Sequence, residues 1–459
     1  MAKLSKQIYI DKKTFICIFK DNWSKYKRLS KYRKVEDENV ERLLKCGDPK
    51  NGFIQLRCFN CGKIKIIPFS CKSRLCPSCS RIHLQERIIK IKSPMIKGAG
   101  HRHVVLTTPK ELWSYFRKDR YLLKVMADAG AELIRDILKF YRKKEGIEPG
   151  IILVIQTSGR SLNFNPHLHL LITEGGLGKD NKWYSISYID QYLLGRKWQY
   201  FLLTRLRKYL PKNERTKRLI DKLFKEKRSF ITYAKKEKKR KVDIVGYLVK
   251  YVVSPPISYR KIIDYKDGEV TFRYQTREGA KNKVKKLPAL GFIYLLVQHI
   301  PEANQKMIHY YGLYTRARSK KMKKIVEKII KSFNQQEWEE EQERLLREIL
   351  SFPTTYRERI KTSYNKDPCI CPICQDEMII EKIVGPDGCV IFDIWKTDYF
   401  QEKTYKEKKD AKLLQKKEKE QEESSRFRSF IAPIVKINKL FPKKQFMILL
   451  KENILILGE

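Results

Sequence analysis

Histidine is rare in this chain, but its placement is uneven. Four of the seven histidines form two His-x-His pairs, and the pair His167 and His169 lies in PHLHLLIT, an apolar run typical of a strand. Because side chains alternate across a strand, both imidazoles project from one face and the intervening leucine from the other. Two imidazoles on one face suit a divalent cation, with a third ligand from a neighbouring element.

The third ligand has two candidates in the sequence. Gln156 lies on the strand predicted just before this one, and His103 lies on an earlier strand in the second pair, with His101. We favour Gln156. The alternative to a metal site is a pair of hydrogen-bonded core histidines, which is the commoner origin of an isolated pair.

A second set of reactive groups follows the histidines. Tyr247 and Tyr251 are four residues apart, so they share one face of a short helix, with Lys250 beside them. A phenol can attack phosphorus, and a nearby cation stabilises the phenolate or the developing charge. The alternative is an amphipathic helix that buries two aromatic rings. The histidine pairs and the charge of the chain favour chemistry.

The cysteines are grouped in CxxC spacings. Cys58 and Cys61 form one such knuckle, and Cys76 and Cys79 form another after an interval of 14 residues. Two knuckles offer four thiolates, the ligand set of a structural zinc site. The alternative is a chance spacing of buried free cysteines. The sequence predicts one zinc ion held by these four residues.

Other cysteines are left over. Near the first cluster these are Cys46 and Cys71, together with His83, and they could support a second site or replace one of the four ligands. Near the end of the chain, Cys371 and Cys374 form a single knuckle between Cys369 and Cys389. For this last group, a zinc site and inert cysteines are equally compatible with the sequence.

Composition points to a polyanionic partner. The chain has 459 residues, and its 99 Lys and Arg against 52 Asp and Glu give a net charge of +47. Such an excess is typical of nucleic-acid binding. The 42% of hydrophobic residues still supply a core, so wholesale disorder is excluded.

Two observations concern the cell compartment. The amino terminus has no uninterrupted apolar segment, and no stretch approaches the roughly 18 apolar residues of a membrane span. The 11 cysteines lie in metal-type spacings within a long chain. We therefore expect a cytoplasmic protein without membrane contact.

The segments that must position these groups alternate between strand and helix patterns. Strands are expected at 103–109, 150–158 and 166–173, with a helix at about 112–144. This order predicts an α+β or α/β domain whose sheet is covered by helices. We expect four segments: a helical and zinc-binding module at 1–90, a catalytic domain at 98–318, a helix with a possible second zinc knuckle at 319–395, and a charged tail at 396–459.

Taken together, the motifs resemble the single-strand DNA transposases of IS91-type rolling-circle insertion sequences, within the HUH endonuclease class. The resemblance runs from about residue 46 to 374 and includes CFNCG, CKSRLCPSC, HRHVVLTTP, NPHLHLL, YLVKYVVSPPIS, HYYGLY and DPCICPIC. It implies an α+β, Rep-like HUH nuclease domain with a central antiparallel-rich sheet, preceded by a zinc-binding module. It also implies that His167 and His169 hold a metal and that Tyr247 and Tyr251 are catalytic.

The sequence departs from the family pattern at three positions. Relatives often have histidine where Leu75 and Asn165 stand, and Val249 replaces a common glycine. The lysine-rich tail after about residue 400 is not covered by the resemblance. These departures leave the paired histidines and tyrosines in place.

The resulting hypothesis is a transposase that nicks and rejoins single-stranded DNA at insertion-sequence ends and at target sites. A magnesium or manganese ion would assist the attack of a tyrosine, forming a 5′-phosphotyrosine link. One alternative is a plasmid replication initiator or relaxase of the same chemistry. The other is a non-catalytic zinc-ribbon protein that binds DNA or RNA without covalent adducts.

Overall fold

A computed structural model describes residues 9–92, 95–96, 99–226, 229–234, 246, 254–275, 282–315, 324–329, 339, 343 and 355–396. The chain divides into two units: unit 1 is Met1–Leu44 with Lys72–Ser351, and unit 2 is Lys45–Cys71 with Phe352–Glu459. These boundaries differ from the expected segments 1–90, 98–318, 319–395 and 396–459. The reason is a strand of residues 53–58 that pairs with residues 378–384, far along the chain.

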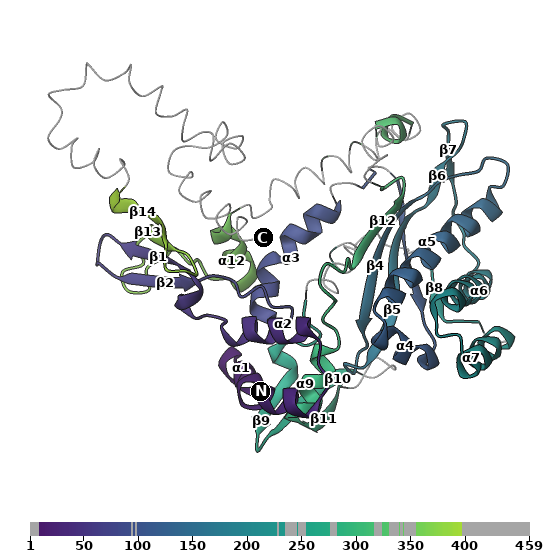
Figure 1. Cartoon of the computed structure of the whole chain (residues 1–459). Coiled ribbons are helices and arrows are strands. Elements are labelled where there is room, and N and C mark those ends of the chain that lie inside the picture. Colours follow the sequence, from purple (N-terminus) through teal and green to yellow (C-terminus); the bar gives the residue numbers. More distant parts are fainter. Residues whose placement is uncertain are drawn as a thin grey trace, which may run out of the picture. The chain divides into compact units, whose positions relative to one another are not determined.

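Unit 1 is built around a five-stranded sheet (Figure 1). Its strands, in spatial order, are β12 (Ile308–Gly312), β4 (Gly150–Ser158), β5 (Phe164–Thr173), β3 (His101–Thr107) and β8 (Thr232–Tyr233). Every neighbouring pair is antiparallel. The predicted α+β fold with an antiparallel-rich sheet is confirmed.

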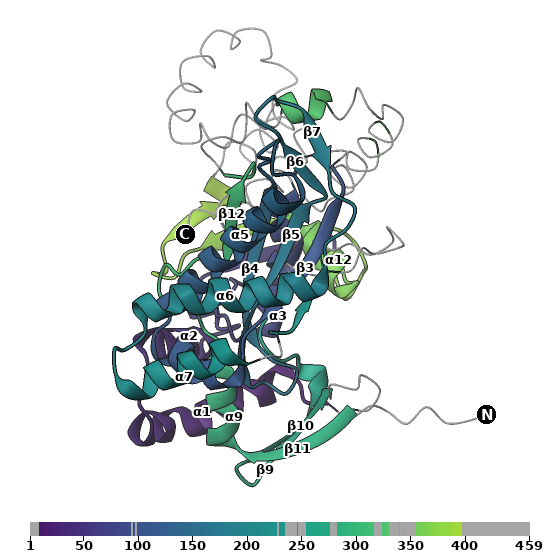
Figure 2. The ribbon, with the colours of Figure 1, turned by 90° about the vertical axis from the view of Figure 1, so that its right-hand side faces the viewer.

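Helices cover one face of this sheet (Figure 2). They are α4 (Trp113–Lys118), α5 (Tyr121–Tyr141), α6 (Gln191–Tyr209) and α7 (Glu214–Lys225). Leu168 and Leu170 of β5 pack into the core that these helices form. A Cβ on Gly130 of α5 would lie 2.7 Å from Leu168 Cδ1, so the glycine allows the helix to lie close to the sheet.

The other face is covered in part by α3 (Pro77–Lys92). Its Ile88 and Ile91 belong to a second core with Ile152, Val154 and Leu171 of the sheet. The polar residues of interest lie on this same face, beyond the apolar contacts.

The remaining elements of unit 1 are short or lie beside the sheet domain. They are α1 (Lys12–Leu29), α2 (Lys34–Leu44), η2 (Lys110–Leu112), β6 (Gly175–Leu177), β7 (Trp183–Ser185), η3 (Tyr259–Lys261), β9 (Ile262–Lys266), β10 (Glu269–Gln275), β11 (Asn282–Pro288) and α9 (Ala289–Val297). Strands β9, β10 and β11 form a separate three-stranded antiparallel sheet.

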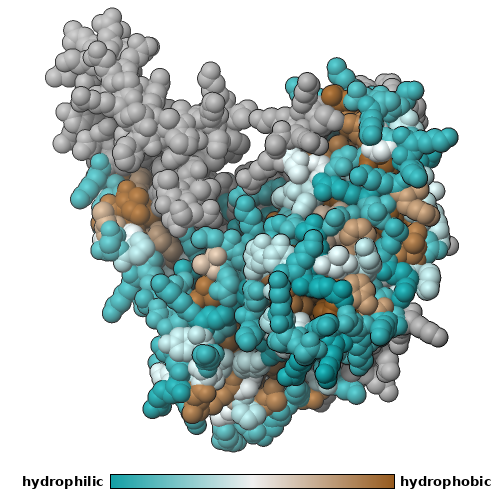
Figure 3. Space-filling model, turned by 45° about the vertical axis from the view of Figure 1, so that its right-hand side comes forward, coloured by the Kyte–Doolittle hydropathy of each residue, from teal (hydrophilic) through white to brown (hydrophobic). Residues whose placement is uncertain are grey.

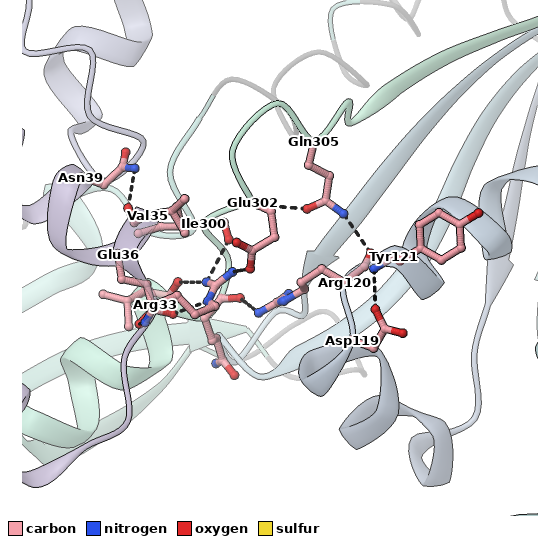
Figure 4. A network of polar contacts seen from close by, with 12 residues as sticks. Arg33, Val35, Glu36, Asn39, Asp119, Arg120, Tyr121, Ile300, Glu302 and Gln305 are labelled. Atoms are coloured by element: carbon pink, nitrogen blue, oxygen red, sulfur yellow. Dashed lines mark hydrogen bonds and ion pairs between the residues drawn. The ribbon is translucent and has the colours of Figure 1, made fainter. Parts of the chain in front are cut away.

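Arg33, just before α2, ties the first helices to the rest of unit 1 (Figure 4). Its guanidinium pairs with Glu36 at 2.7 Å and with Glu302 at 2.5 Å. It also donates to the main-chain oxygens of Val297 and Ile300. The residue therefore joins segments about 270 positions apart through charge-assisted hydrogen bonds.

Replacing Arg33 by alanine is expected to destabilise unit 1 by about 3 kcal/mol, because it leaves the buried carboxylate of Glu36 without its guanidinium. Urea unfolding measures the loss. Lys27→Ala is the matched control, since its pair with Asp37 is partly exposed and such pairs contribute about 0–1 kcal/mol. Equal losses in both variants would contradict the role of Arg33.

Unit 2 contains a four-stranded antiparallel sheet made from both of its chain segments. The spatial order is β14 (Val390–Asp393), β13 (Met378–Val384), β1 (Phe53–Cys58) and β2 (Ile64–Pro68). The other elements are η1 (Pro49–Asn51), α12 (Tyr356–Tyr364) and η4 (Ile394–Lys396). The central pair, β1 and β13, joins residues more than 300 positions apart.

Hydrophilic residues cover most of the face drawn in Figure 3, and apolar residues form small patches on it. Within the described part of the chain, no helix is long and apolar enough to cross a bilayer.

Candidate functional site

The two histidines of β5 lie on the face opposite the helical core. His169 is buried, and its Nε2 lies 2.7 Å from Oε1 of Gln156 on the neighbouring strand β4. His167 and Gln156 are directly opposed in the β4–β5 ladder, so their side chains share this face. The structure confirms the predicted alternation of side chains along this strand, which places His167 and His169 on one face.

His103 lies on the other flank of the same histidine. Its Nε2 is 3.0 Å from Nδ1 of His169, and the two rings stack with their centroids 5.2 Å apart. Both candidates for a third ligand are therefore adjacent to His169, on opposite sides of its ring: Gln156 faces Nε2, and His103 faces Nδ1.

The ring of His167 is oriented by the backbone. Its Nδ1 lies 2.7 Å from the carbonyl oxygen of Asn165, and a carbonyl can only accept a hydrogen bond. The proton is therefore on Nδ1, and Nε2 carries the lone pair. A backbone acceptor on one ring nitrogen is the usual support for a histidine that binds a metal through the other.

Burial sets the charge of these imidazoles. It lowers the pKa of His103 to about 4 and lowers the pKa of His167. Burial, with smaller contributions from His167 and His103, holds the pKa of His169 well below its usual value. The rings are therefore neutral at pH 7, which is the form that coordinates a cation.

These donors fit a divalent cation. Two imidazole nitrogens and an amide oxygen form a mixed N and O ligand set of the kind that manganese accepts. The 2.7 Å contact between His169 and Gln156 is a hydrogen bond in which Nε2–H donates, because an amide oxygen only accepts; a cation would take the same two atoms in place of that proton.

The second His-x-His pair does not act as a unit. His101 is bonded through Nε2 to the hydroxyl of Tyr314 at 2.6 Å, and burial lowers its pKa to about 4. It is a hydrogen-bonded histidine of the kind that was the alternative for His167 and His169. Only His103 of this pair reaches the β5 histidines.

A cavity of about 50 Å³ lies beside Gln156. It is lined by Arg74, Leu75, Ile155, Gln156, Thr157, Ser158, Ser254, Pro256, Leu296, His299, Ile300, Pro301 and Met307. His299 is held by Thr157 Oγ1 and by the carbonyl of Leu162. No sequence pattern predicted that Arg74 and Ser254 line the same cavity as Gln156, because both come from segments distant from β4.

Tyr247, Lys250 and Tyr251 lie outside the described residues. The described chain resumes at Ser254, three positions after Tyr251, and Ser254 lines the cavity beside Gln156. The assignment of the two tyrosines and the lysine stays a prediction.

The cysteines are grouped differently from the predicted set of Cys58, Cys61, Cys76 and Cys79. In unit 2 the sulfurs of Cys58, Cys61, Cys371 and Cys374 all lie within 4.8 Å of one another. A four-coordinate site completed by these residues has no position for Cys76 and Cys79, which belong to unit 1 at the start of α3. The sulfurs are thus grouped differently from the predicted set, because a strand near the first knuckle pairs with a distant segment, and zinc binding by these cysteines stays a prediction.

The other cysteines are distributed as follows. Cys46 is buried and Cys71 half-buried in unit 2, and Cys76 and Cys79 are buried in unit 1. Cys369 is buried, and Cys17 and Cys389 are exposed. The structure does not describe the side chain of His83. Zinc binding by Cys46 and Cys71 stays a prediction.

Comparison with known proteins adds independent information. A family model described as "Putative transposase" matches residues 150–323, and one described as "Transposase zinc-binding domain", of the IS91 type, matches residues 18–108. No solved structure matches the chain.

Two curated relatives are similar over most of their length. A transposase for insertion sequence element IS801 from Pseudomonas savastanoi pv. phaseolicola is 30% identical over 300 residues, which are 61% of this chain and 70% of the relative. The putative transposase y4qJ of Sinorhizobium fredii (strain NBRC 101917 / NGR234) is 25% identical over 358 residues, 72% of this chain and 86% of the relative.

Proposed function

The chain belongs to the IS91-type family of insertion-sequence transposases, and from this premise we propose that it nicks and rejoins single-stranded DNA during rolling-circle transposition. The observation that carries the proposal is the contact between His169 and Gln156, on the face that His167 shares. This supports a set of three donors for one divalent cation, and Gln156 of that set lines the cavity. An HUH-type nuclease needs such a cation at the scissile phosphate.

We assign His167, His169 and Gln156 as ligands of magnesium or manganese. His103 contacts the other nitrogen of His169, so we assign it a positioning role rather than coordination. A cation bound there supplies Lewis-acid polarisation of the scissile phosphate. The protein residues keep the imidazoles neutral through burial and fix the ring of His167 through the Asn165 carbonyl.

The position of Ser254 supports a role for the two tyrosines. Three residues span at most about 11 Å, which limits the distance between the backbones of Tyr251 and Ser254. Ser254 lines the same cavity as Gln156, so chain connectivity alone limits how far from this cavity the backbone of Tyr251 can be. Tyr247 is four residues earlier, on the same face if the segment is helical. This supports their assignment as nucleophiles.

The reaction that we propose transfers a phosphodiester to the protein. The phenol oxygen of one tyrosine attacks phosphorus, and the bond from phosphorus to the 3′ oxygen breaks. This leaves a 5′-phosphotyrosine and a free 3′-hydroxyl, whose oxygen takes up one proton to balance the one that the phenol has lost to solvent. Lys250 stabilises the phenolate before attack. Attack by a 3′-hydroxyl on the phosphotyrosine reverses the step and rejoins the DNA.

The charge of the chain fits the substrate. A net charge of +47 supplies phosphate contacts whose strength falls with salt. Two tyrosines allow a second strand to be cut while the first remains covalently attached. The partners are therefore single-stranded DNA at the insertion-sequence ends and at the target, with zinc as a structural ion.

Incubation with single-stranded oligonucleotides from the ends of the element and Mn²⁺ is expected to give a protein–DNA adduct. The adduct resists denaturation because a phosphotyrosine bond is covalent. A denaturing gel detects it as a shifted band that protease removes, and chelation of the metal is expected to prevent it. Binding without any adduct, at every metal tested, would favour a non-catalytic nucleic-acid-binding protein.

A further inference from the structure

Four thiols from opposite ends of the chain meet in unit 2. Cys58 Sγ lies 3.4 Å from Cys374 Sγ, and Cys61 Sγ lies 3.5 Å from both Cys371 Sγ and Cys374 Sγ. These distances are far longer than the roughly 2.05 Å of a disulfide. They are close to the roughly 3.8 Å that separates thiolates bound tetrahedrally at about 2.3 Å from a zinc ion.

The two knuckles have the same backbone turn. In the first, Cys58 N–H donates to Lys63 O and Gly62 N–H donates to Cys58 O. In the second, Cys371 N–H donates to Asp376 O and Gln375 N–H donates to Cys371 O. The two loops therefore close with identical spacing.

The equivalence extends to the dihedral angles. The residue after the second cysteine of each knuckle has positive φ, 71° at Gly62 and 60° at Gln375. A glutamine in this conformation is strained, so the second turn is held by its surroundings.

The surrounding core is small. It consists of Ile54, Leu56, Cys58, Cys369, Cys371, Met378, Ile380 and Ile383. Three of the eight are cysteines, and the sheet around them has only four strands. A module of this size usually needs a metal or disulfides to fold, and no disulfide is present among the described cysteines.

We propose that Cys58, Cys61, Cys371 and Cys374 hold one structural zinc ion, which joins the first and last described segments of unit 2 into a single zinc ribbon. Four thiolates select zinc among the abundant divalent ions. The family model for the zinc-binding domain covers residues 18–108 and so includes only half of this ligand set. The segment around Cys371 is thus part of the zinc module, although the catalytic unit separates the two in sequence.

Elemental analysis of the purified full-length chain tests this assignment. We expect Cys371→Ser to lower bound zinc by one equivalent per chain, and Cys389→Ser to leave it unchanged. Cys389 is the matched control because it lies in the same unit, is exposed and is outside the cluster.

A double variant distinguishes one shared site from two separate sites. If the four cysteines share one ion, then Cys58→Ser, Cys371→Ser and the combination all lose the same single equivalent. Two independent sites would make the double variant lose more than either single variant, which would overturn the proposal. So would a wild-type chain whose cluster holds iron, or zinc retention in Cys371→Ser.

A third variant is the control for general misfolding of Cys371→Ser. Cys371→His keeps a zinc ligand at this position, so it is expected to restore the zinc equivalent that Cys371→Ser loses. Failure of histidine to restore zinc, while Cys389→Ser keeps it, would show that position 371 matters for packing alone. The adduct assay remains a separate readout, so failure of this proposal is distinguishable from failure of the nuclease mechanism.

Discussion

Replacing both Tyr247 and Tyr251 by phenylalanine is expected to abolish the covalent protein–DNA adduct completely, without unfolding the protein. The substitution removes both hydroxyls and keeps both rings, so packing is preserved while the nucleophile is lost. Each single variant is expected to retain nicking in a single turnover and to lose complete transposition. The reason is that a cycle that cuts donor and target strands needs a second nucleophile while the first is occupied.

The matched control is the double variant Tyr192→Phe with Tyr200→Phe. Both residues are exposed on α6, the helix that covers the opposite face of the sheet. It is expected to form the adduct at the wild-type level. Mass mapping of the trapped peptide identifies the attacking residue.

One described tyrosine gives this test a sharp alternative outcome. Tyr233 of β8 is exposed and opposes Val105, which in turn opposes His169, so it lies on the histidine face. An adduct at Tyr233, or an adduct that survives in the double variant of Tyr247 and Tyr251, would contradict the assignment. The argument from the net positive charge of the chain to DNA binding would be unaffected.

Changing both His167 and His169 to alanine is expected to remove cleavage, by at least a thousandfold, and to leave DNA binding nearly intact. Two neutral imidazoles contribute little to phosphate binding, which is spread over many lysines and arginines. The slope of log affinity against log salt is therefore expected to match that of the wild type. Cleavage is followed on gels, and binding by titration at several salt concentrations. Metal-dependent nicking in the double variant would refute the metal role.

Three further variants sharpen this second test. His309→Ala is the control, because His309 opposes Leu153 of β4 and so lies on the opposite face of the same sheet. Gln156→Ala is expected to raise the Mn²⁺ concentration needed for cleavage more than His103→Ala does, since Gln156 is assigned as a ligand and His103 as the residue that positions His169. The reverse order would exchange the two roles.

The sheet that carries the histidines was predictable from local pattern. β5 alternates polar and apolar residues over the stretch that contains His167 and His169, and β4 is an apolar run ended by Ser158. Such patterns specify which side chains share a face. They do not specify which nitrogen of His169 faces Gln156, because that depends on the order of β4, β5 and β3 in the sheet.

The zinc ligand set was not predictable for a related reason. The residues FIQLRC form a strand on local grounds, but nothing local identifies Met378–Val384 as its partner. Pairing the two nearest CxxC knuckles was the simplest assignment, and it differs from the structure. The single knuckle at Cys371 and Cys374 was the one indication of a ligand set that spans both ends of the chain. One knuckle supplies two thiolates, so a four-thiolate zinc site needs two more from another part of the chain.

The discontinuity of unit 2 has a consequence for the order of events during synthesis. Cys61 and Cys374 are 313 positions apart. At about 5–20 residues per second, the ribosome needs roughly 15 to 60 s to pass from one to the other. During that interval the first knuckle has only half of its ligands, while the residues of unit 1 between them emerge and begin to fold. If the four cysteines bind one ion as proposed, metal capture is a late step, and chains released before residue 374 cannot complete it.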